Sequence, residues 1–94
     1  MSAKHTPGPW VIDESRHGKR GPVHTLMVVA EKGGMPGLIV NQGALVEPQD
    51  WANARLIAAA PDLLEALKGV VRVADRDTVE FIAARAAIRK AEGR

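Results

Sequence analysis

The chain has 94 residues, 46% of them hydrophobic and 26% charged, so a disordered protein is not expected. Its net charge of +2 is far from the basic excess with which nucleic-acid-binding proteins neutralise phosphates. Cysteine is absent, which excludes disulfides, thiolate zinc sites and a cysteine nucleophile. The first residues, MSAKHTPGPW, lack the apolar segment of a signal peptide. We therefore expect a single cytoplasmic domain over residues 1–94, without a membrane-spanning segment.

The first half of the chain has the pattern of short β-strands separated by turns. We predict strands at 10–13, 23–30 and 37–41, since each is rich in β-branched or large apolar residues and bounded by Gly, Pro or polar residues. Residues 31–36 have the length of a hairpin loop, which makes the second and third strands antiparallel neighbours. Residues 14–21, ESRHGKRG, form a polar loop in this prediction.

Helical spacing of apolar residues begins at about Pro48. We expect the first helix to end before Pro61, because a proline inside a helix removes a backbone hydrogen bond. A second helix would begin there, since proline suits the first turn of a helix. The last helix is predicted from Thr78 to about Glu92, with Asp77 as the N-cap of a capping box.

Together these patterns predict an α+β fold, in which a small antiparallel sheet of about three strands is followed by two or three helices packed on it. Residues 1–47 form the β-rich half of the single domain and residues 48–94 the helical half.

The last helix is expected to have two packing partners, because its apolar residues fall on two sides. One stripe contains Val79, Ile82, Ala83 and Ala86, and the other contains Phe81, Ala84, Ile88 and Ala91. Gly69, inside the preceding helix, is unfavourable by about 1 kcal/mol relative to Ala, unless another backbone packs closely there. We therefore expect a homo-oligomer that associates through the last helix and the region of Gly69.

Asn53 occupies an unexpected position, because it shares a helix face with the apolar Leu56 and Ile57. A buried amide without partners is unfavourable by about 1–3 kcal/mol. Asn53 is therefore expected to bond a neighbouring backbone edge, such as the TPGPW turn. Alternatively, together with Arg55, it reaches a bound ligand or a second subunit.

Two motifs, Thr6 to Trp10 (TPGPW) and Ala52 to Leu67 (ANARLIAAAPDLLEAL), carry a resemblance. The pair resembles a group of small accessory proteins of bacteriophages and prophages, and more distantly the Ea22-like phage early proteins. The resemblance implies an accessory phage gene, in a neighbourhood that often carries anti-defence or host-takeover functions. It also implies action by stoichiometric binding in the infected bacterial cell.

Several basic residues are candidates for binding an anionic ligand. The glycine-flanked loop places Arg16, Lys19 and Arg20 where backbone N–H groups can converge on an anion, although a solvated hairpin loop explains them equally. In the helical half, Arg72 and Arg76 are four residues apart, as are Arg85 and Arg89, so each pair shares a helix face. Interleaved acidic residues favour a solvated mixed face over a nucleic-acid interface.

The remaining candidates are aromatic residues and histidines. Trp10 and Trp51 are expected to anchor the contact between sheet and helix, and would bind a partner if exposed. Phe81, Arg85, Ile88 and Arg89 are further candidates for partner binding. His5, His17 and His24 lack the spacing of metal ligands, and no catalytic motif is present, so we predict neither a metal, nor a cofactor, nor an enzyme.

The favoured hypothesis is a non-enzymatic counter-defence protein that sequesters a host immune component. Within it, the favoured ligand is a phosphate-bearing nucleotide signal, bound at a subunit interface by Arg side chains. One alternative is an inhibitor of a CRISPR effector or another host enzyme that acts through protein contacts alone. The other is a small DNA-binding regulator.

Overall fold

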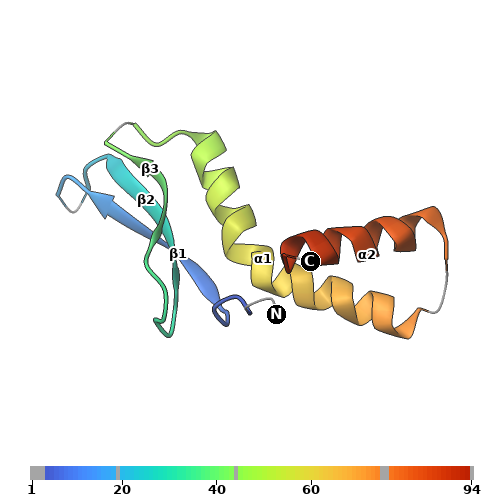
Figure 1. Ribbon diagram of the computed structural model, residues 1–94. Helices are drawn as coiled ribbons and strands as arrows, with labels where there is room; N and C mark the ends of the chain where they lie inside the picture. The colour runs from blue at the N-terminus through green and yellow to red at the C-terminus, as the bar shows by residue number, and fades with distance from the viewer. Residues whose placement is uncertain (1–3, 19, 44, 75–76, 94) are drawn as a thin grey trace. The chain divides into compact units, whose positions relative to one another are not determined.

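The computed structural model describes residues 4–18, 20–43, 45–74 and 77–93, and it has the predicted α+β fold. Three strands form an antiparallel sheet in the order β1-β2-β3, and two helices follow (Figure 1). The elements are β1 Trp10–Arg16, β2 Val23–Ala30, β3 Leu38–Gln42, α1 Pro48–Val73 and α2 Val79–Ala91.

The chain divides into two compact units. The sheet unit is Thr6–Pro61, and the helical unit is Asp62–Arg94 together with Met1–His5. Helix α1 contributes to both units, and Pro61 is the last residue of the sheet unit. The boundary between the units therefore falls inside a helix, whereas the predicted halves meet at residue 47. A single domain over residues 1–94 stays a prediction.

Strand β2 is the centre of the sheet, with a hydrogen-bonded neighbour on each side. It pairs with β1 from Trp10 opposite Ala30, and with β3 from Val28 opposite Leu38. Its sequence VHTLMVVA is rich in β-branched residues, which suits a strand enclosed by two others. The observed bounds of β2 are those predicted. In contrast, β1 extends three residues beyond its predicted end.

The core of the sheet unit is small. Leu26, Val28 and Ala54 are fully buried, so the first part of α1 lies against the helix-facing side of β2. Ala54 has only a methyl group, which allows the helix backbone to approach the strand closely. Partly buried apolar residues surround these three: Trp10, Ile12, Val40, Val46, Trp51, Ile57 and Ala58.

The expectation that Asn53 lies on the buried face of its helix is wrong. Asn53 is exposed, and so is Leu56, whereas Ala54 and Pro61 are buried. Residues 54, 57, 58 and 61 have helical spacing, so the face toward the sheet is centred about one residue away from the predicted face. The reason is the close contact at Ala54, which a larger side chain would prevent. Asn53 consequently needs no buried partner.

The expectation that a helix ends before Pro61 is also wrong, because α1 continues through it. A proline inside a helix is unfavourable by about 3 kcal/mol. Here the ring is buried against Gly8 of the TPGPW segment, where an added Cβ would lie 3.3 Å from Pro61 Cβ. The indole N–H of Trp10 donates to the carbonyl oxygen of Thr6 at 3.1 Å, which closes the same segment on itself. The two sequence motifs are therefore in direct contact.

Helix α2 begins one residue later than the capping-box prediction requires. The N-cap is Thr78, whose hydroxyl accepts a hydrogen bond of 3.4 Å from the backbone N–H of Phe81. Asp77, the predicted cap, instead accepts a hydrogen bond of 2.7 Å from the Arg85 guanidinium. Neighbouring Asp and Thr residues are both good caps, and the pairing of Asp77 with Arg85 leaves that role to Thr78.

Candidate functional site

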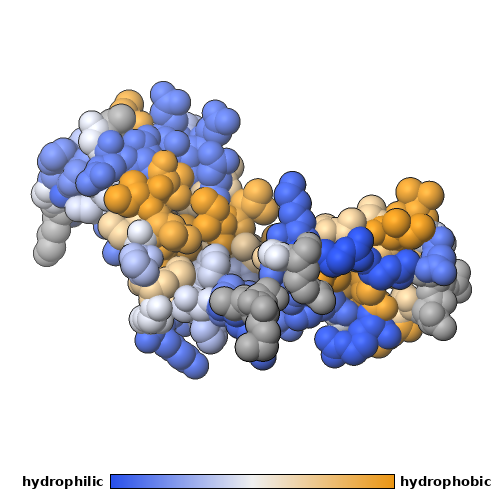
Figure 2. All heavy atoms as spheres, in the orientation of Figure 1, coloured by the Kyte–Doolittle hydropathy of each residue, from blue (hydrophilic) through white to orange (hydrophobic). Residues whose placement is uncertain are grey.

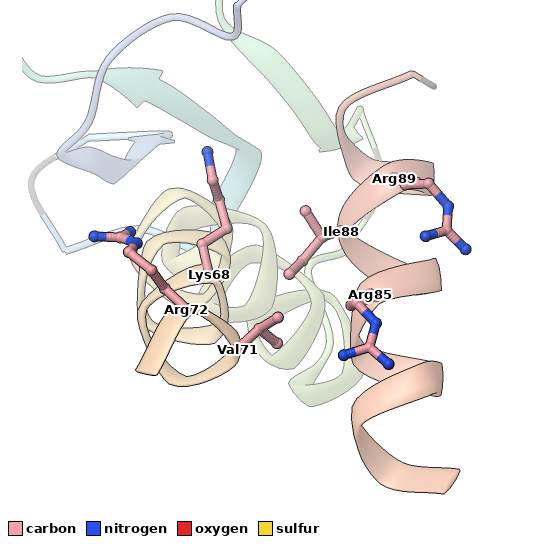
Figure 3. Close-up of a pocket in the computed structure, with 6 residues that line it drawn as sticks. All are labelled: Lys68, Val71, Arg72, Arg85, Ile88 and Arg89. Atoms are coloured by element: carbon pink, nitrogen blue, oxygen red, sulfur yellow. The ribbon is translucent and has the colours of Figure 1, made fainter. Parts of the chain in front are cut away.

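A groove between the two helices is a candidate ligand site of the helical unit. Its cavity volume is about 350 Å³, within the range of small-molecule sites. Residues of both helices line it (Figure 3): Lys68, Val71 and Arg72 from α1, and Arg85, Ile88 and Arg89 from α2.

The groove has an apolar floor and a cationic rim. Val71 is half-buried and Ile88 is buried, and the two side chains lie between the helices (Figure 3). Arg72 points away from α2, and Arg89 points away from α1, so their guanidinium groups lie at the outer edges (Figure 3). A ligand of this groove would thus meet aliphatic carbon at its centre and positive charge at its ends.

Carboxylates neutralise only part of the rim. Lys68 Nζ lies 2.9 Å from Glu92 Oε2 and 3.9 Å from Glu65 Oε1. The pair with Glu92 also joins the C-terminal end of α2 to α1. Arg85 is paired with Asp77, as above. Within the described ranges, Arg72 and Arg89 have no carboxylate within ion-pair distance. These two arginines can therefore accept an outside anion without breaking an internal pair.

Four residues that the sequence had singled out line this groove: Arg72, Arg85, Ile88 and Arg89. The pattern gave no reason to select Lys68 or Val71 for ligand binding, although Lys68 precedes Arg72 by one helical turn. Phe81 is half-buried and lies outside the lining. Arg76 lies outside the described residues.

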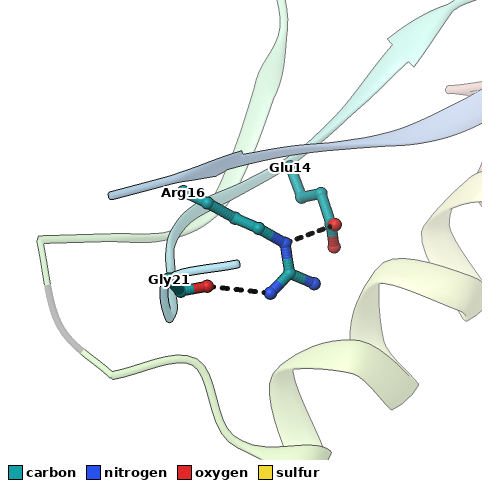
Figure 4. A network of polar contacts seen from close by, with 3 residues as sticks. All are labelled: Glu14, Arg16 and Gly21. Atoms are coloured by element: carbon teal, nitrogen blue, oxygen red, sulfur yellow. Dashed lines mark hydrogen bonds and ion pairs between the residues drawn. The ribbon is translucent and has the colours of Figure 1, made fainter. Parts of the chain in front are cut away.

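In the polar loop of the sheet unit, Arg16 is engaged in closing the loop (Figure 4). Its Nε donates to Glu14 Oε1 at 2.9 Å, and its Nη1 donates to the carbonyl oxygen of Gly21 at 2.9 Å. The Gly21 N–H is bonded to the Gly18 carbonyl, so it is not directed at an anion. Arg20 is exposed, and Lys19 lies outside the described residues. Anion binding by this loop stays a prediction.

The other candidates of the sheet unit differ in exposure. Asn53 and Arg55 are both exposed on α1, and neither makes a side-chain hydrogen bond to another described residue. Trp10 and Trp51 are half-buried against the core, which is the anchoring position expected of them. Their indoles therefore offer at most part of their surface to a partner.

The histidines form a stacked pair. The rings of His17 and His24 are 3.9 Å apart with an interplanar angle of 20°. His24 Nε2 lies 3.5 Å from Ser15 Oγ, while its Nδ1 is buried without a hydrogen-bond partner in the part of the chain that the structure describes. Across those same ranges, no three His, Cys, Asp or Glu side chains are grouped so as to hold a metal ion.

Three comparisons and one property of the helices bear on the class of the protein. No described helix is long and apolar enough to cross a membrane. No curated protein and no solved structure matches the chain. A family model does match, over residues 1–94, and its description is Salmonella phage P22 protein Y8K6. The chain therefore belongs to this phage protein family.

Proposed function

We propose that this phage protein is a non-enzymatic binding protein that captures a phosphate-bearing ligand in the groove between α1 and α2. The observation that carries the proposal is the pair of arginines on the rim, Arg72 and Arg89, which have no carboxylate partner within the described residues. A guanidinium binds phosphate through two parallel N–H groups, which suits it to this role better than an ammonium.

The favoured ligand is a nucleotide signal of the host immune system. The apolar floor formed by Val71 and Ile88 fits the face of a base, and the separated cations fit phosphates at more than one position. A protein that sequesters such a signal in the cytoplasm of the infected cell would act as a counter-defence protein. Its phage family agrees with that setting.

Isothermal titration with cyclic oligonucleotides and ADP-ribose derivatives tests this function. The wild type should bind at least one of them, and Arg72→Ala with Arg89→Ala should weaken binding by about tenfold or more, since a charged hydrogen bond contributes roughly 1.5–3 kcal/mol. A matched control is Lys32→Ala with Lys90→Ala, which removes the same charge from exposed positions outside the groove. Absence of heat with every nucleotide would refute the proposal, as would equal losses in both double variants.

An inhibitor that acts through protein contacts is the second candidate. Leu38 and Ile39 on the edge strand β3 are 41% and 55% exposed. The backbone of an edge strand can pair with a strand of another protein, and exposed apolar side chains beside it add contacts. This function predicts a stable complex with a host protein that survives Arg72→Ala with Arg89→Ala but not Ile39→Lys. A DNA duplex in the same titrations tests the regulator hypothesis, since such binding weakens steeply with salt.

A further inference from the structure

Helix α1 has a second apolar stripe in the helical unit, separate from the groove. It consists of Leu63, Ala66, Val70 and Val73, all of which are exposed. Leu63 and Val70 are 53% and 52% exposed, and Val73 is 84% exposed. Their spacing of three, four and three residues is that of the contact positions of a coiled coil.

This stripe is not the side of α1 that carries the groove. On that side, Leu64, Leu67 and Val71 are half-buried, and Lys68 is bonded to Glu92 of the C-terminal turn. Apolar side chains are visible at the surface of the helical unit (Figure 2). A row of exposed Leu and Val on a helix indicates an interaction surface, because a soluble monomer rarely leaves such a row uncovered.

Gly69 is a second indication that another helix packs against this side of α1. It lies beside the stripe, three residues after Ala66 and four before Val73. A Cβ added to Gly69 would meet no atom within 4 Å, and the helical backbone there does not require glycine. Contacts within the described chain therefore do not explain a residue that is unfavourable in helices by about 1 kcal/mol. The backbone of another helix packed close to this position would explain it.

The charges along the flank of the stripe indicate which helix fits. Asp62 and Glu65 lie at its N-terminal end, and Arg72 lies at its C-terminal end, all exposed. An antiparallel copy of the same helix sets the acidic end of each against the arginine of the other. A parallel copy would instead set like charges side by side.

We infer that a second copy of this chain covers the stripe, with the two α1 helices antiparallel and Gly69 next to the two-fold axis. In this register Leu63 faces Val73 of the second copy, and Ala66 faces Val70. The pairs of Ala66 with Val70 then lie at the centre of the contact, and the bulkier pairs of Leu63 with Val73 lie at its ends. The inference does not require a ligand in the groove, but it gives Arg72, one of the two rim arginines, carboxylate neighbours on the second copy, so a bound anion and the second copy would compete for this side chain.

Sedimentation equilibrium of the full chain tests whether a second copy covers the stripe. The wild type should be a dimer, and Val70→Glu should be a monomer, because it buries an unpaired charge in the contact. Val79→Glu is the matched control, since Val79 is 79% exposed on α2 outside the stripe. It should remain dimeric. A monomeric wild type, a dimeric Val70→Glu, or equal dissociation of both variants would overturn the inference.

Disulfide cross-linking tests the direction of the helices, since the chain has no cysteine of its own. A mixture of Leu63→Cys and Val73→Cys chains should form a mixed disulfide dimer under mild oxidation, whereas neither variant should cross-link to itself. Self-cross-linking of each variant alone would show a parallel pair, and no cross-link in the mixture would show that the stripes do not meet. Either result overturns the antiparallel arrangement.

Discussion

The side-chain amide of Asn41, in strand β3, donates a hydrogen bond of 2.8 Å to the carboxylate of Asp50 in the first turn of α1. The same carboxylate oxygen accepts a bond of 2.9 Å from the backbone N–H of Glu47, the residue before the helix. Asp50 thus satisfies a free N–H at the helix N-terminus and links the helix to the sheet. The bond from Glu47, followed by that from Asn41, lowers the pKa of Asp50 below its ordinary value of 3.8.

This lowered pKa predicts a loss of stability in acid. The carboxylate stabilises the fold fully above its ordinary pKa of 3.8, and that contribution disappears as the pH falls through the lower folded value. Asp50→Asn should therefore lower the melting temperature at about pH 7, and the difference from the wild type should vanish as the pH falls below the lowered pKa of Asp50. Thermal unfolding followed by circular dichroism measures it. Asp13→Asn is the control, since Asp13 is exposed on β1, and it should show no such pH-dependent gap.

The contact between Gly8 and Pro61 predicts a steep dependence on side-chain size. An added Cβ at Gly8 would be 3.3 Å from Pro61 Cβ, which is tight, and a branched side chain would not fit without moving the helix. Gly8→Val should destabilise the sheet unit by about 1–3 kcal/mol, as overpacking does, and Gly8→Ala by less. Urea unfolding followed by tryptophan fluorescence compares them. Equal stability of the valine variant and the wild type would contradict the contact.

The buried core predicts a large effect of truncation. Leu26 and Val28 are the two large side chains that are fully buried among the described residues. Leu26→Ala should therefore destabilise the protein by about 2–5 kcal/mol, which a core this small can scarcely tolerate. Leu45→Ala removes the same atoms from a position that is 71% exposed, and it should change the free energy of unfolding by about 0.5 kcal/mol or less. Urea midpoints of both variants provide the measurement.

Local patterns predicted most of the sheet, and long-range contacts account for the differences in α1. Strand β2 was predictable because eight residues of one composition lie between Pro22 and a turn. Pro61, inside α1, packs against Gly8, which is more than fifty residues away in the chain, so no local pattern contains this contact. The exposure of Asn53 follows from the contact at Ala54, since a helical pattern limits the buried face only to within about one residue.

The lining of the groove could also be predicted only in part from the sequence. The spacing of Arg85 and Arg89 predicted that they share a face of their helix. Which residues of α1 lie across from them depends on how the two helices are aligned, and sequence periodicity does not determine that alignment. The sequence therefore did not identify Lys68 and Val71 as part of the lining.

The two candidate N-caps of α2, Asp77 and Thr78, are neighbours in the sequence but have different partners in the structure. Thr78→Ala removes the hydroxyl that accepts from the Phe81 N–H, and should destabilise the helical unit by about 1 kcal/mol. Thr78→Ser should retain most of the stability, because a serine hydroxyl caps equally well. Asp77→Ala breaks an exposed ion pair and should have a smaller effect than Thr78→Ala. Far-ultraviolet circular dichroism during urea unfolding ranks the three variants. A larger loss in Asp77→Ala than in Thr78→Ala would return the capping role to the aspartate.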